Sequence, residues 1–142
     1  MTPVIVRDMT STTPSLDRLS LLEDPGLRGG ALCRAYSGLM DDWLSALFAS
    51  TVADPTGIAM VAVGGYGRAE LSPSSDIDLM LVHSGRKDIA EIAQQVWYPI
   101  WDESLKLGHA VRTVKEALSL ASDDLDTATS LLSARCIAGD QA

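Results

Sequence analysis

Apolar residues recur at helical spacing in the first third of the chain. Between residues 27 and 51 these positions are Leu32, Tyr36, Leu39, Met40, Trp43 and Leu47. Side chains three or four residues apart lie on one face of an α-helix, so the pattern predicts an amphipathic helix that packs against a core. The sequence Ala-Asp-Pro-Thr-Gly at 53–57 should end this helix.

The pattern then changes to short apolar runs of strand length. IAMVAV at 58–63 runs into a glycine pair, and DIDLMLVH at 76–83 follows a turn at Pro73. Beyond Asp78 the second run is apolar on both faces, which is typical of a central strand covered by helices. HAVRTV at 109–114 alternates between apolar and polar residues and predicts a third strand.

Two further helices are expected in the second half of the chain. The first covers about 87–105 and carries Trp97 and Trp101 on one face as core anchors. The remainder of the chain after 114 is also expected to be helical, especially over 126–138, with Gly139 as the C-cap. The predicted order is helix, strand, strand, helix, strand, helix, which indicates an α/β fold with a small mixed sheet flanked by helices.

The length of 142 residues suits one domain. Residues 1–14 are rich in Thr, Ser and Pro and predict a flexible tail. We expect an N-terminal helical segment over 15–56 and the α/β core over 57–142, truncated at its C-terminus.

Charge and composition exclude several classes of partner. The formal net charge is -8, with 11 Lys and Arg against 19 Asp and Glu, which opposes broad contact with nucleic acid. A small nucleotide is still compatible, because a local pocket and a divalent metal can override the overall sign. The N-terminus lacks the apolar core of a signal peptide, and no apolar run approaches the roughly 20 residues of a membrane span. We therefore expect a cytoplasmic protein with no membrane partner.

Two carboxylates open the central strand within the sequence GGYGRAELSPSSDIDL, residues 64–79. Side chains alternate along a strand, so Asp76 and Asp78 should project to one side while Ile77 points into the core. Two such carboxylates can converge on a divalent cation, and hard oxygen ligands favour Mg²⁺ or Mn²⁺. The alternative is a strand that opens with two solvated aspartates.

The glycine pair could hold phosphate. Gly64 and Gly65 end the preceding strand, where the absence of side chains would let a triphosphate lie against backbone N–H groups. GRAEL at 67–71 should form a short helical turn, and Arg68 could add a direct charge contact. Alternatively, the glycines serve only a turn that needs positive φ.

These residues carry a resemblance to a known family. Gly-Gly followed by Asp-x-Asp on the next strand resembles the nucleotidyltransferase superfamily that includes DNA polymerase beta. The longer string GGYGRAELSPSSDIDLMLV is similar to the uridylyltransferases of the nitrogen regulatory protein PII. WYPIWDESLKLGHAVRTVKEAL and DLDTATSLLSARCIAGD resemble later segments of the same family, so the similarity runs from about Val61 to Asp140.

The resemblance implies a polymerase beta-like fold and a metal-dependent nucleotidyltransferase. It implies transfer of UMP from UTP to a tyrosine hydroxyl of PII with release of pyrophosphate; some actinobacterial relatives use ATP and attach AMP. By position, Gly64 and Gly65 would be the phosphate loop, and Asp76 and Asp78 the ligands of Mg²⁺ or Mn²⁺.

Two features depart from the family pattern. The superfamily usually has a third carboxylate on a later strand, but 109–114 carries His109 and Arg112 instead. Asp102 or Glu116 could substitute for it, and Arg112 is a candidate to reach phosphate. The family's proteins are also far longer and continue into helical, HD-type phosphohydrolase and ACT domains.

Two alternative functions share these features. A small-molecule nucleotidyltransferase, such as one that acts on aminoglycosides, has the same Gly-Gly and Asp-x-Asp pattern. A catalytically silent nucleotide-binding or interaction module is favoured by the missing third carboxylate and by the short chain.

Overall fold

The computed structural model describes residues 16, 18, 22–71 and 76–140. The tail predicted over 1–14 lies outside these residues, as does the turn at Pro73. The elements are α3 (Gly29–Thr51), β1 (Ile58–Ala62), α4 (Gly64–Gly67), β2 (Ile77–His83), α5 (Ile89–Asp102), β3 (Leu107–Thr113), α6 (Val114–Asp123), α7 (Leu125–Leu131) and β4 (Arg135–Gly139).

The four strands form one mixed sheet in the order β3-β2-β1-β4. β2 pairs with β3 in parallel, and β1 pairs with both β2 and β4 in antiparallel orientation. The parallel connection passes through α5, as a crossover between parallel strands requires. β2 is interior to the sheet, so the prediction of a central strand is confirmed.

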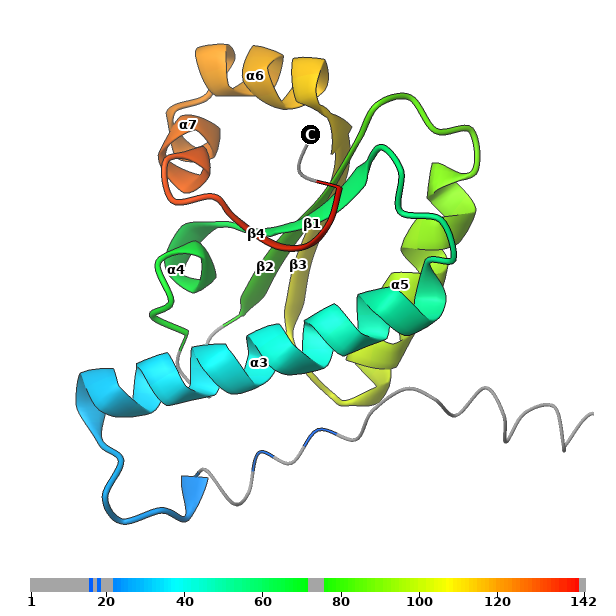
Figure 1. The fold of residues 1–142 in the computed structure, drawn as a ribbon. Coiled ribbons are helices and arrows are strands. Elements are labelled where there is room, and N and C mark those ends of the chain that lie inside the picture. Colours follow the sequence, from blue (N-terminus) through cyan, green and yellow to red (C-terminus); the bar gives the residue numbers. More distant parts are fainter. Residues whose placement is uncertain (1–15, 17, 19–21, 72–75, 141–142) are drawn as a thin grey trace, which may run out of the picture.

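Helices cover both faces of the sheet (Figure 1). α3 and α5 pack on one face and build the main core with the alternate strand residues Ile58, Met60, Ile77, Leu79 and Leu81. α6 and α7 pack on the other face, over a smaller cluster centred on Val63, Met80 and Ala117. Period-2 alternation along β1 and β2 therefore sends one set of side chains into each layer.

The helix predicted over 126–138 is wrong in its second half. α7 ends at Leu131, and β4 pairs with the outer edge of β1. Gly139 is not a helix C-cap: it ends β4 with φ +103°, and a Cβ there would overlap the carbonyl oxygen of Ile58. Pairing with a distant strand satisfies the backbone of β4, so tertiary structure overrides the local pattern.

The two tryptophans of α5 differ in burial. Trp97 is 4% exposed and is a core anchor, as predicted, whereas Trp101 is 42% exposed. The His109 ring on β3 lies near both, with ring centroids 5.3 Å from Trp97 and 5.5 Å from Trp101. Trp101 is therefore part of an exposed aromatic group rather than the core.

Candidate active site

Asp78 lies at the start of β2, close to the end of β1 and beside β3. Its backbone carbonyl accepts a hydrogen bond from the Val63 amide at 3.1 Å, which joins the end of β1 to the start of β2. The preceding Ile77 is 1% exposed in the main core, while Asp78 is half-buried on the opposite face. Asp76 lies just before the strand and is exposed. Ile77 therefore points into the core, as predicted, and Asp78 points away from it.

The surroundings of Asp78 disfavour its negative charge. Burial of the carboxyl raises the pKa of Asp78, and the negative charge of Asp76 raises that pKa further. A carboxylate that is destabilised by desolvation and by a like charge gains most from a cation placed beside it. The aspartate pair thus has the electrostatics expected of a cation-binding site.

Glycines lie against both oxygens of the Asp78 carboxylate. A Cβ added to Gly64 would be 3.3 Å from Oδ2, and one added to Gly108 would overlap Oδ1. Gly108 is on β3 and is the register partner of Asp78 in the parallel pair. Sequence reasoning missed Gly108, because only the pairing register of β2 and β3 brings it to this place.

The helical turn predicted over 67–71 forms three residues earlier. α4 begins at Gly64, which has φ +63°, and Arg68 is its C-cap residue. The positive φ turns the chain directly out of β1, so the helical turn starts at the first glycine. A Cβ on Gly65 would meet only the Arg68 guanidinium, at 3.7 Å. Gly64 therefore has the conformation of a turn glycine, and Gly65 does not.

The two arginines predicted to reach phosphate lie in different places. Arg68 follows α4 and donates from Nε to Glu70 Oε1 at 2.6 Å, with both side chains exposed. Arg112 is the register partner of Val82, four residues along β3 from Gly108. At about 3.3 Å per residue this places Arg112 some 13 Å from the Asp78 end of the strand. The structure therefore places Arg68 beside the glycine turn and the backbone of Arg112 farther along β3.

Neither substitute for the third carboxylate joins the aspartate pair. Glu116 forms a capping box with Thr113, whose amide donates to Glu116 Oε1 at 2.8 Å. Asp102 is the last residue of α5. Within the described part of the chain, no group of three or more His, Cys, Asp or Glu side chains is arranged to hold a metal ion.

Two carboxylates still fit a magnesium site. Mg²⁺ in nucleotide enzymes is commonly bound by one or two carboxylates together with substrate phosphates and water. The half-buried Asp78, with Asp76 beside it and glycine on two sides, matches that donor set.

Among the described helices, none is long and apolar enough to cross a bilayer.

Comparison with known proteins agrees with this geometry. The family model described as glutamate-ammonia ligase adenylyltransferase (GlnE) matches residues 4–115. A bifunctional uridylyltransferase/uridylyl-removing enzyme of Streptomyces coelicolor is 48% identical over 125 residues, which are 87% of this chain and 15% of that protein. An enzyme of the same name in Mycobacterium tuberculosis is 52% identical, over 63% of this chain and 11% of that protein. Another in Phenylobacterium zucineum is 38% identical, over 82% of this chain and 14% of that protein.

The chain spans 11–15% of the length of these relatives. Its four-stranded mixed sheet with helices agrees with the polymerase beta-like nucleotidyltransferase fold. The chain belongs to the glutamate-ammonia ligase adenylyltransferase family, and it is a nucleotidyltransferase domain homologous to the bifunctional uridylyltransferase/uridylyl-removing enzymes.

Proposed function

We propose that this domain transfers a nucleoside monophosphate, UMP from UTP or AMP from ATP, to a tyrosine hydroxyl of PII. The tyrosine oxygen forms a bond to the α-phosphorus, and the bond from that phosphorus to the bridging oxygen of the leaving pyrophosphate breaks. The hydroxyl proton passes to water. The observation that carries the proposal is the Asp78 carboxylate, held between Gly64 and Gly108 with Asp76 beside it.

Asp76 and Asp78 are the residues proposed to hold Mg²⁺ or Mn²⁺. When bound, the metal would neutralise charge on the triphosphate and favour loss of the proton from the attacking hydroxyl. The aspartates would supply oxygen ligands at the N-terminal end of the central strand β2, and the two carboxylates repel each other until a cation is present.

The glycine turn is proposed to hold the triphosphate. Gly65 has open space at its Cβ position apart from the Arg68 guanidinium, so backbone and phosphate could approach closely there. Arg68 would supply a positive charge once it exchanges Glu70 for phosphate. That exchange costs little free energy, because the exposed ion pair contributes little to stability. Arg112 lies four residues along β3 from Gly108, so its contact with phosphate stays a prediction.

The test is transfer of labelled nucleotide. The 142-residue chain is incubated with Mg²⁺, α-labelled UTP or ATP, and either PII or a panel of aminoglycosides. We expect label on a PII tyrosine, and none when Asp76→Asn or Asp78→Asn replaces the wild type. Asp88 is an exposed carboxylate beyond the far end of β2, so Asp88→Asn is the control and should transfer normally.

Other outcomes would contradict the proposal. Label on an aminoglycoside and none on PII would indicate a small-molecule nucleotidyltransferase. Nucleotide binding without transfer to any acceptor would indicate a silent module, which is the alternative favoured by the lack of a third carboxylate among the described residues.

A further inference from the structure

One arginine joins the glycine turn to two distant parts of the fold. Arg135, at the start of β4, donates from Nη1 to Asp41 Oδ2 on α3 at 2.6 Å. It also donates to the last two carbonyls of α4, from Nη2 to Tyr66 O at 2.9 Å and from Nε to Gly67 O at 3.2 Å. A planar guanidinium, with its donors spread in a rigid fork, can bind a carboxylate and two carbonyls that lie apart, whereas the compact ammonium of lysine does not match that spread.

Tyr66 completes the connection from within α4. Its hydroxyl donates to Asp41 Oδ1 at 2.7 Å, and its ring lies 5.4 Å from Cζ of Arg135. Tyr66 is 1% exposed, and burial together with the bond to Asp41 raises its pKa, so the phenol stays protonated and remains a donor. Both oxygens of Asp41 are therefore occupied by groups that hold α4.

α4 needs such support because it has only four residues. A single helical turn has little stability of its own in water. Gly67 also lies directly against the segment before β4, since a Cβ there would overlap the carbonyl oxygen of Ser133. The position of Gly64 and Gly65 relative to Asp78 is thus set by contacts from α3 and β4.

We propose that Asp41, Tyr66 and Arg135 are positioning residues that hold the glycine turn at the distance from Asp78 that a metal-bound triphosphate requires. This inference rests on the proposed function. None of the three side chains needs to touch the nucleotide, because their polar groups are directed to each other and to the α4 backbone.

The experiment measures nucleotide affinity beside thermal stability. Calorimetric titration with MgUTP and with MgATP gives Kd for the wild type, Arg135→Lys and Tyr66→Phe, each well below its melting temperature. We expect Arg135→Lys to raise Kd by about tenfold or more, the loss typical when a group that orients a ligand-binding residue is removed. Tyr66→Phe keeps the ring and loses one hydrogen bond, so its effect should be smaller in the same direction.

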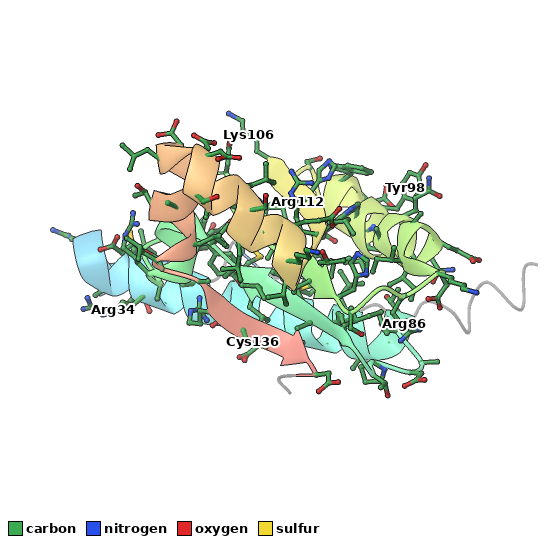
Figure 2. The ribbon with its side chains drawn as sticks, turned by 90° about the horizontal axis from the view of Figure 1, so that it is seen from above. Arg34, Arg86, Tyr98, Lys106, Arg112 and Cys136 are labelled. Atoms are coloured by element: carbon green, nitrogen blue, oxygen red, sulfur yellow. The ribbon has the colours of Figure 1, made fainter. Side chains whose placement is uncertain are left out.

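Arg86 offers a matched control. It also joins a carboxylate, Asp88, to two backbone carbonyls, those of Asp54 and Thr56, each at 2.8–2.9 Å from a terminal guanidinium nitrogen. It follows the far end of β2, well separated from Lys106, whose carbonyl binds Ile77 at the Asp78 end (Figure 2). Arg86→Lys should lower the melting temperature and leave Kd unchanged.

The outcomes separate the two proposals. If the wild type binds but Arg135→Lys has the wild-type Kd, or if Arg86→Lys weakens binding equally, the positioning inference is overturned while the proposed function stands. If the wild type binds neither nucleotide, the proposed function is overturned and the positioning role falls with it.

Discussion

The carboxylate of Asp78 lies directly against Gly108, its partner across the parallel pair of β2 and β3. Any larger residue at 108 would overlap Oδ1, and a Cβ at position 64 would lie 3.3 Å from Oδ2. The absence of side chains at both positions therefore leaves the space that this carboxylate occupies. Its orientation depends on two segments that lie on either side of it in the sequence.

Gly108→Ala should reduce nucleotide transfer far more than stability. The added methyl group meets the end of a side chain, which can rotate away, so the free energy of unfolding should change by only about 1 kcal/mol. A carboxylate displaced by about 1 Å can cost on the order of a hundredfold in rate. Steady-state transfer and urea denaturation measured together check this prediction.

A matched control for Gly108→Ala is Gly38→Ala. Gly38 is in α3, and a Cβ there meets nothing within 4 Å. It should stabilise the helix by roughly 1 kcal/mol and leave transfer unchanged. Normal transfer by Gly108→Ala would show that the orientation of Asp78 does not matter.

Gly65→Ala is the direct test of the phosphate turn. Gly65 lacks positive φ and its Cβ would be in ordinary contact with Arg68, so the free energy of unfolding should hardly change. Nucleotide affinity should fall, because the methyl group occupies the space proposed for phosphate. Calorimetric binding and a thermal melt on one preparation decide the matter, and full affinity would leave the turn purely structural.

Gly67→Ala should destabilise the fold, in contrast to Gly65→Ala. The new Cβ would overlap backbone, the carbonyl oxygen of Ser133, and backbone cannot rotate away as a side chain can. We expect a loss of about 1–3 kcal/mol in the free energy of unfolding, measured in urea. Gly65→Ala, two residues earlier in the same turn, is the control.

Asp78→Asn should make the nucleotide-free protein more stable at pH 7. The pKa of Asp78 is raised from its usual 3.8, so the folded state holds this proton more tightly than the unfolded state does. Ionisation therefore costs stability as pH rises from 3.8 through the raised value, and the variant avoids that cost. Its advantage should shrink as pH falls back toward 3.8 and vanish below it.

Asp88→Asn should change the free energy of unfolding in the opposite direction, measured over the same pH series. The hydrogen bond from Arg86 lowers the pKa of Asp88, so its ionised form stabilises the fold above pH 3.8. Removing that charge should lower stability at pH 7, and the difference should disappear in acid. If Asp78→Asn behaved like Asp88→Asn in urea titrations between pH 3 and pH 7, Asp78 would not be under electrostatic strain.

Local pattern in the sequence was enough to predict α3, β1 and β2 and the sides to which Ile77 and Asp78 point. Helical spacing over 27–51 predicted α3, and the apolar runs predicted β1 and β2 within one residue of their observed bounds. Alternation placed Ile77 in the core and Asp78 on the opposite face, because side-chain direction in a strand depends only on residue parity. These features are properties of neighbouring residues, which a sequence displays directly.

Only the tertiary structure decided what surrounds the aspartate pair. Gly108 meets Asp78 through the register of two strands separated by α5, and Arg135 reaches α4 only because residues 135–139 form a strand instead of the predicted helix. Arg112, which the sequence offered as a phosphate ligand, lies toward the other end of β3 in that same register. The hydrophobic pattern excludes a one-residue slip, which would turn the apolar face outward. Which residues pair across two strands joined by a helix depends on the packing of that helix on the sheet.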